Sequence, residues 1–188
     1  LEGKAQKREG VGELGSSWPQ PLPRIGVAES RSTTNQAITA SDQGLGEGIE
    51  LDPGWVGGWH RRGDVYVQKK DYDQAIKDYS EAVKLDPGLA PAWYNRGLAY
   101  QGKGNYDQAI KDFSEVIKLE PDDVAAWNNR GSAYNEKGEY NQAIRNHSES
   151  IKLKPDYAAG WYNRGNAYRK KGEYDQATKD YSEAIRLK

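Results

Sequence analysis

The sequence predicts an all-α solenoid built from repeated helix pairs, and three features of its pattern lead to this fold class. Tryptophan recurs every 34 residues, at Trp59, Trp93, Trp127 and Trp161. Other residues recur in the same phase: Gly63, Gly97, Gly131 and Gly165; Ala75, Ala109, Ala143 and Ala177; Pro53, Pro87, Pro121 and Pro155. The chain also holds 6 Trp and 13 Tyr against a single Phe, a skew typical of one template copied several times. A fixed period of about 20–50 residues indicates a repeat architecture.

Each unit has the pattern of two short helices. In the first half of the second unit, Trp93, Gly97 and Tyr100 are spaced i, i+4, i+7 and therefore share one helix face. The second half, residues 106–119, carries an apolar stripe with the period of an amphipathic helix. Pro121 follows this stripe and prevents the helix from continuing.

The sequence also marks where helices end and begin. Gly104 follows the first helix of its unit, and glycine commonly terminates a helix. Asp71 and Asn105 stand just before second helices, where a side-chain oxygen can cap free backbone N–H groups. Glu139 and Glu173 fill the same position in the last two units.

The chain divides into two parts of different composition. Residues 1–54 hold 9 of the 21 Gly, 4 of the 8 Pro and one aromatic residue, so we expect a flexible N-terminal segment. Residues 45–52 align with the end of the first unit's second helix, which leaves a decayed helix and continued disorder as alternatives there. The repeat array covers 56–188, with units at 56–89, 90–123, 124–157 and 158–188.

The composition argues against several classes of protein. The formal net charge of −1 does not suit a nucleic-acid binder, which usually carries a basic field. No stretch approaches the ~18 consecutive apolar residues of a membrane-spanning helix, so we expect no membrane partner. The absence of cysteine excludes disulfides and thiolate chemistry. Because the chain starts at Leu1 and contains no Met, we expect a piece of a longer protein.

The units resemble the tetratricopeptide repeat. The family pattern Trp-x-x-Leu-Gly-x-x-Tyr corresponds here to Trp93-x-x-Arg96-Gly97-x-x-Tyr100, and Ala-x-x-x-Phe corresponds to Ala109-x-x-x-Phe113. The constant departure is Arg for Leu, which gives an Asn-Arg-Gly subtype in three of the units. The resemblance implies a right-handed superhelix of antiparallel helix pairs, whose concave face usually binds a peptide or protein.

This resemblance places one set of first-helix residues on the concave face. An amide carries both donors and an acceptor, so a row of Asn can hold a peptide backbone without reading its sequence. Tyrosine adds flat contact area for an apolar side chain. The alternative is that Asn is only a tolerated solvent-facing residue of this repeat subtype. The expected groove residues are His60, Arg61, Asp64, Tyr94, Asn95, Leu98, Gln101, Asn128, Asn129, Ser132, Tyr162, Asn163 and Asn166.

Two rows of charged residues have a structural interpretation. The constant arginines could bind an anion, but we favour the hypothesis that each pairs with an acid of the second helix in its unit. The partners would be Asp78 for Arg62, Asp112 for Arg96, Asn146 for Arg130 and Asp180 for Arg164. On the second helices, a basic residue precedes Glu81, Glu115, Glu149 and Glu183 by four positions, which predicts ion pairs on a solvated outer face.

The sequence indicates no catalytic, metal or cofactor site. His60 and His147 lie in different units, and His147 occupies a ring position of the core, where we expect a packed histidine. Neither a His-x-x-x-His spacing for a metal nor a Gly-rich phosphate loop before a helix is present. We therefore expect a protein that is not an enzyme.

These observations predict a protein–protein interaction scaffold that binds a peptide or protein segment in its concave groove. Two alternatives stay open: a structural or self-associating repeat module, and a non-catalytic regulatory arm of a larger protein. Self-association as a homo-oligomer would use the last unit, because Tyr181, Ala184 and Ile185 lie on a unit without a polar capping element. The sequence leaves the compartment undetermined, with the cytoplasm favoured.

Overall fold

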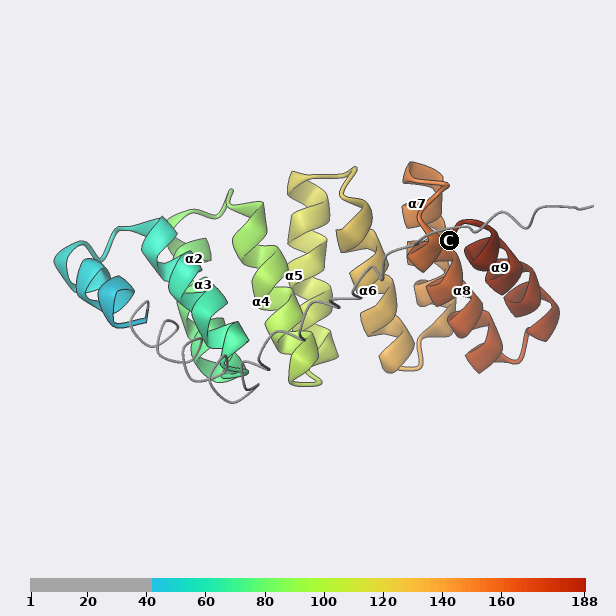
Figure 1. The fold of residues 1–188 in the computed structure, drawn as a ribbon, viewed down its shortest axis with the longest axis horizontal. Helices are drawn as coiled ribbons and strands as arrows, with labels where there is room; N and C mark the ends of the chain where they lie inside the picture. The colour runs from blue at the N-terminus through green and yellow to red at the C-terminus, as the bar shows by residue number, and fades with distance from the viewer. Residues whose placement is uncertain (1–41) are drawn as a thin grey trace, which may run out of the picture.

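The computed structural model describes residues 42–188, and all regular secondary structure within that range is helical (Figure 1). Most of the predicted flexible segment, residues 1–41, therefore lies outside the described part. A first helix covers residues 42–51. The array follows as α2 (Val56–Gln68), α3 (Tyr72–Leu85), α4 (Ala90–Gly102), α5 (Tyr106–Leu119), α6 (Val124–Glu136), α7 (Tyr140–Leu153), α8 (Ala158–Lys171) and α9 (Tyr174–Arg186).

The helices form an elongated row of pairs, from the helix over residues 42–51 at one end to α9 at the other (Figure 1). Within a pair the two helices pack closely, as in α2 with α3 and α4 with α5. Each second helix also packs against the first helix of the next pair, as α3 does against α4. This pattern confirms the predicted all-α solenoid. None of the described helices is long and apolar enough to cross a membrane.

Glycine allows the two helices of each pair to approach closely. A Cβ atom added at Gly97 would lie 2.9 Å from a ring carbon of Phe113, and one added at Gly63 would lie 2.6 Å from the ring of Tyr79. Real Cβ atoms do not come this near to other heavy atoms. The ring of the second helix therefore fills the space that a side chain at the glycine would need, and Phe113 and Tyr79 are buried there.

Tryptophan fastens each first helix to the turn that precedes it. The indole Nε1 of Trp93 donates a hydrogen bond to the backbone oxygen of Pro87 at 2.9 Å. Trp59 makes the same bond to Pro53 at 3.0 Å. The remaining pairs, Trp127 with Pro121 and Trp161 with Pro155, are also 2.9 Å apart. The 34-residue period of Trp and Pro thus reflects one contact made four times.

The helix over residues 42–51 packs against α2 through contacts that the other repeats do not have. Ile49 of this helix is buried, and its Asp42 forms an ion pair with Lys69 at 2.6 Å. The ring of Trp55 fills the space between Gly48 and Gly58, because a Cβ at either glycine would lie within 2.8 Å of that ring. Gly48 weakens the first helix but also makes room for the tryptophan, and Gly58 does the same from α2.

The helix ends follow the predicted signals. The side chains of Asp71 and Asn105 accept hydrogen bonds from the backbone N–H groups of Gln74 and Gln108, which confirms both as N-caps. Glu139 makes no such bond. In three repeats the turn between the helices uses a glycine with positive φ: Gly104 at 75°, Gly138 at 80° and Gly172 at 89°. In the first repeat, Lys70 adopts the same conformation at φ 60°.

Lys70→Gly is expected to stabilise the protein by about 0.5–1 kcal/mol, because a residue with a Cβ is strained in the left-handed region. The measurement is the free energy of unfolding in urea. The reciprocal change, Gly104→Lys, is the control and should destabilise the protein, since nothing lies within 4 Å of a Cβ there and only the backbone is tested. Equal stability of Lys70→Gly and the parent chain would contradict the strain.

Candidate functional site

A partly buried arginine, Arg96, Arg130 or Arg164, connects three helices at each junction between successive repeats. The Nε and Nη2 atoms of Arg96 donate to the two carboxylate oxygens of Asp112, both at 2.8 Å. Its Nη1 donates to Ser80 Oγ on the preceding second helix at 3.1 Å. The guanidinium also lies 4.6 Å from the centre of the Trp93 ring, within the range of a cation–π contact. These contacts confirm the structural role predicted for the arginine row.

The arginine recurs in the other three repeats with two departures: Gly46 stands where a serine would contact Arg62, and Asn146 replaces the carboxylate beside Arg130. Arg62 pairs with Asp78 at 2.7 Å and Arg164 with Asp180 at 2.7 Å. In the third repeat, Arg130 donates to the neutral amide oxygen of Asn146 at 2.7 Å. The hydrogen bonds that Arg62 and Arg164 donate to these carboxylates raise the pKa of both arginines, whereas burial lowers the pKa of Arg130. In the third repeat a partly buried cation therefore pairs with an amide and not with a carboxylate.

The expected asparagine row forms a ladder of hydrogen bonds between successive first helices. The side-chain amide of Asn95 donates to Asp64 Oδ1 at 3.0 Å, which links α4 to α2. Asn129 donates to the hydroxyl of Tyr94 at 2.8 Å, and Asn163 donates to Asn128 Oδ1 at 3.1 Å. Each of these amides thus donates a hydrogen bond to the neighbouring repeat. Sequence reasoning placed these residues on one face but missed the bonds among them.

Several other predicted groove residues are fixed by the same network. Asp64 also accepts from the Tyr79 hydroxyl at 2.7 Å, and Asn166 accepts from the Tyr181 hydroxyl at 2.9 Å. His60 Nε2 lies 3.2 Å from the amide of Asn95. The hydroxyls of the core rings thus hold polar side chains of the first helices in place.

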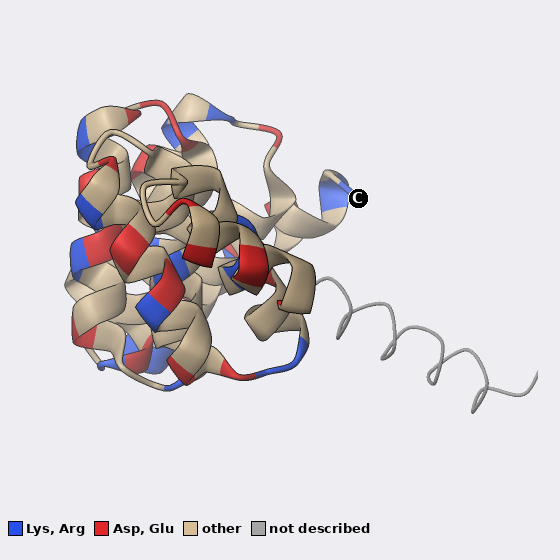
Figure 2. Cartoon of the chain, turned by 90° about the vertical axis from the view of Figure 1, so that its left-hand side faces the viewer, with Lys and Arg blue, Asp and Glu red and all other residues tan. Residues whose placement is uncertain are grey.

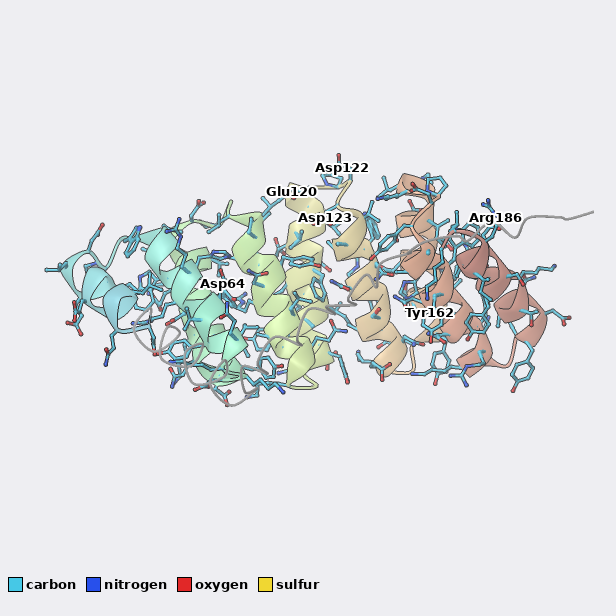
Figure 3. All side chains as sticks on the ribbon, in the orientation of Figure 1. Asp64, Glu120, Asp122, Asp123, Tyr162 and Arg186 are labelled. Carbon is cyan, nitrogen blue, oxygen red and sulfur yellow. The ribbon has the colours of Figure 1, made fainter. Side chains whose placement is uncertain are left out.

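The predicted residues differ widely in exposure. Arg61, Leu98 and Tyr162 are exposed, whereas Gln101 and Ser132 are partly buried. Asn128 is only 4% exposed, which corrects its expected role as a groove contact. In Figure 3, Asp64 on α2 and Tyr162 on α8 lie toward opposite ends of the row of helices.

His147 explains the burial of Asn128. Its ring is fully buried, as predicted, at the position that Phe113 holds in the second repeat. Its Nδ1 lies 3.1 Å from Asn128 Oδ1. The buried Nε2 has no hydrogen-bond partner within residues 42–188. Burial, together with the positive charge of Arg164, lowers the pKa of His147 to about 3. The imidazole is therefore neutral at physiological pH.

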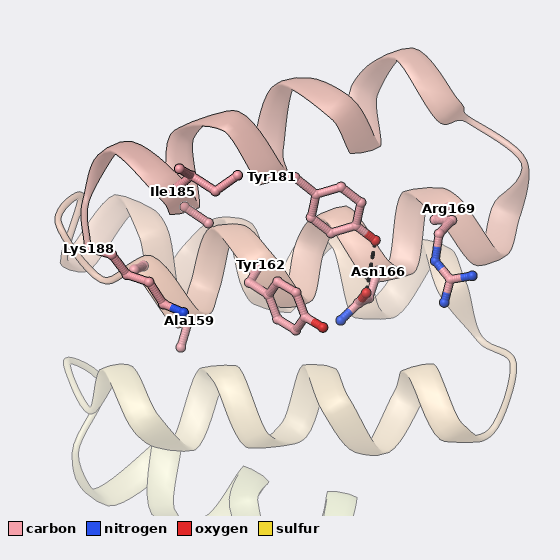
Figure 4. Close-up of a pocket in the computed structure, with 9 residues that line it drawn as sticks. Ala159, Tyr162, Asn166, Arg169, Tyr181, Ile185 and Lys188 are labelled. Carbon is pink, nitrogen blue, oxygen red and sulfur yellow. Dashed lines mark hydrogen bonds between the residues drawn. The ribbon is translucent and has the colours of Figure 1, made fainter.

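Several hollows lie along the described part of the array, and two of them are lined by predicted groove residues. A cavity of about 190 Å³ is bounded by Tyr94, Asn95, Val116, Glu120 and Asp123, with Ala90 and Pro91 completing the lining. A larger one, about 680 Å³, lies against the last helix pair (Figure 4). Tyr162, Tyr181 and Ile185 form its apolar part, and Arg169 and Lys188 contribute charge.

The remaining charges are distributed over the surface. Acidic and basic residues alternate over the end view of the molecule in Figure 2, without a region of one sign. The predicted glutamate pairs form with the basic residue three positions later, not four positions earlier: Glu81 with Lys84, Glu115 with Lys118, Glu149 with Lys152 and Glu183 with Arg186. Among residues 42–188, no cluster of three or more His, Asp or Glu could hold a metal ion.

A solenoid of near-identical helix pairs, with a repeated junction and a fixed row of side chains, defines a helical-repeat protein. Family models described as TPR repeat and tetratricopeptide repeat match residues 63–104 and 131–171, 90–123 and 158–188, and 113–145. The chain belongs to the tetratricopeptide repeat family, whose members are generally non-catalytic interaction modules. It is thus a protein-interaction scaffold.

Solved structures agree with this fold. A crystal structure of MamA is 24% identical, covers 87% of this chain and 95% of that chain, and has a TM-score of 0.78. MamA from Desulfovibrio magneticus RS-1 is 18% identical over 85% of this chain and 90% of that chain, with a TM-score of 0.77. YrrB, described as a TPR protein with an unusual peptide-binding site, is 20% identical over 86% and 82%, with a TM-score of 0.73. Comparison with curated proteins gave no significant match.

Asn146→Asp is expected to stabilise the protein by about 1–2 kcal/mol, because it gives buried Arg130 the carboxylate found at the other junctions. Urea unfolding is the measurement. Asn141→Asp adds the same charge at an exposed position in the first turn of α7, where Asp73 and Asp107 stand in the first two repeats, and should stabilise the protein by less than about 1 kcal/mol. A loss of stability in Asn146→Asp would contradict the equivalence of the four junctions.

His147 is expected to make the protein less stable as the pH falls below about 6.5. The folded-state pKa, about 3, is below the unfolded value, so the unfolded chain takes up a proton that the folded chain excludes. Stability should fall by up to about 1.4 kcal/mol per pH unit between pH 6.5 and 5. Unfolding measured in this interval should be less pH-dependent in His147→Phe, since Phe113 fills the same position in the second repeat.

The matched control is the same exchange at the chain's other histidine. His60→Phe keeps His147 and should therefore keep the steep fall of stability below pH 6.5. If His147→Phe and the parent chain lost stability in parallel, the buried histidine would not be the cause.

Proposed function

We propose that the concave face formed by α2, α4, α6 and α8 binds an extended segment of a partner protein. The observation that carries the proposal is the ladder of hydrogen bonds from Asn95 to Asp64, from Asn129 to Tyr94 and from Asn163 to Asn128. A surface whose side chains are already held in place loses little conformational entropy when it binds a ligand. The groove is thus preorganised.

The ladder leaves hydrogen-bonding capacity for a ligand. The amides of Asn129 and Asn163 each use one N–H, and that of Asn95 contacts both Asp64 and His60. Within residues 42–188 the Oδ1 atoms of all three accept no hydrogen bond. These oxygens can accept from the N–H groups of a peptide backbone, one per repeat. This arrangement modifies the simpler idea of a free amide row, because the amides bind the neighbouring repeat and the ligand together.

Apolar and acidic groups beside the ladder add further contacts. Leu98 is exposed on α4, beside this row, and can contact an apolar side chain. Glu120 and Asp123, near the junction of α5 and α6, line the smaller cavity with Tyr94 and suit a basic or hydrogen-bond-donating group (Figure 3). The likeness to YrrB, described as having a peptide-binding site, also supports a peptide ligand.

Leu98→Arg is expected to abolish capture of partners from a native lysate by the full 188-residue chain, because the charge opposes the apolar contact. Leu119→Arg is the matched control, since Leu119 is exposed to a similar degree, 42% against 39%, but lies on a second helix. Proteins held by the parent and by Leu119→Arg and lost by Leu98→Arg would support groove binding. Equal capture by all three chains, with unaltered helicity, would overturn it.

A further inference from the structure

The smaller cavity lies in the interior of the array, where the second repeat meets the third. Its volume is about 190 Å³, and Pro91, Tyr94 and Val116 form its apolar walls. Glu120 and Asp123 each add a carboxylate to the lining. Figure 3 shows these two acids near each other, at the same end of α5 and α6. The cavity thus combines apolar walls, which suit the stem of a side chain, with two negative charges.

The walls of this cavity are held in place by contacts within the array. The ring of Tyr94 packs edge-on against Phe113, with 5.7 Å between the ring centres, and its hydroxyl accepts a hydrogen bond from Asn129 at 2.8 Å. Asp123 Oδ1 accepts from two backbone N–H groups in the first turn of α6, at 2.8 and 3.0 Å. Because these groups are already ordered, binding of a side chain between them costs little conformational entropy.

The two carboxylates have no cation beside them. None of the ion pairs among residues 42–188 includes Glu120 or Asp123. Within the same range Asp123 Oδ2 accepts no hydrogen bond, and the side chain of Glu120 is exposed. Burial and, next, the negative charge of Asp123 raise the pKa of Tyr94, which indicates that this charge reaches the tyrosine hydroxyl. The cavity is therefore negatively charged and complementary to a cation.

This combination occurs at one junction of the array, unlike the asparagine row. The other repeats do not place an acid at both of the positions that Glu120 and Asp123 hold. The corresponding pairs are Asp86 with Leu89 in the first repeat and Lys154 with Tyr157 in the third. A row of amides that recurs in three repeats can bind a peptide backbone in more than one register. A side-chain pocket that occurs once can select a single register.

We propose that this cavity binds the side chain of a lysine or arginine of the partner segment and so sets the register in which the segment lies in the groove. The inference rests on the proposed function, because Tyr94 belongs to both the cavity and the groove. The stem of the basic side chain packs against the apolar walls, and its N–H groups donate to Glu120 and Asp123. Hydrogen bonds between ionised groups are about twice as strong as those between neutral ones.

The probe is a library of random peptides displayed on phage and selected on the full 188-residue chain. Selected sequences are synthesised with an acetylated N-terminus, so that only side chains carry positive charge, and their affinities are measured by calorimetry. We expect the selected peptides to share a lysine or arginine at one position. Exchange of that residue for methionine, which keeps an unbranched stem and removes the charge, should weaken binding by about tenfold or more.

A double variant of the chain assigns this preference to the cavity. Glu120→Gln with Asp123→Asn removes both charges at nearly constant shape, and asparagine caps a helix as well as aspartate does. This variant should bind the basic peptide about tenfold more weakly and should no longer prefer it to the methionine peptide. The matched control is Glu81→Gln with Glu115→Gln, which removes two charges from the second helices α3 and α5 and should bind as the parent chain does.

Leu98→Ser separates this inference from the proposed function, because it removes an apolar groove contact without adding charge. Peptides that lose binding in Leu98→Ser but share no basic residue would leave groove binding intact and overturn the role of the cavity. A shared basic residue whose exchange costs the parent chain and the double variant equally would overturn it as well. If no selected peptide depends on Leu98, the proposed function fails and the register pocket fails with it.

Discussion

The arginine at the centre of each junction is the interaction on which the rest of the array depends. It reaches the carboxylate of its own pair, the serine of the preceding pair and the face of the neighbouring tryptophan, so one side chain sets the position of three helices. A guanidinium suits this place because its planar donors match a carboxylate in two bonds while its face stacks on an aromatic ring. The family's leucine at this position could supply only packing.

The fold could be predicted from the sequence because most of the residues that shape it recur in phase along the repeats. Glycine spacing, the apolar stripe and the Asn and Asp caps all act locally, and the structure bears them out at Gly97, Asp71 and Asn105. The Arg–Asp pairs could also be predicted, because both residues recur with the same 34-residue period. The partners of exposed charged side chains could not be predicted, because several cations lie within reach of each glutamate. The glutamates of the second helices pair with the basic residue three positions later.

The candidate site was less predictable because it depends on distances between repeats. Period alone places Asn95, Asn129 and Asn163 on one face, but not within hydrogen-bonding reach of Asp64, Tyr94 and Asn128. The irregular third repeat adds a further departure, since His147 draws Asn128 into the core. The side chains proposed to contact a ligand thus also join the repeats, and a change at one of them affects both affinity and stability.

The contact of Arg130 with the uncharged amide of Asn146 has a mechanical consequence. In a linear array each pair touches only its neighbours, so a pulling force passes through the junctions in series and the weakest one yields first. This junction lies in the interior of the array. Under tension the solenoid would therefore open first at its third pair, where the arginine that joins the two helices has no carboxylate partner.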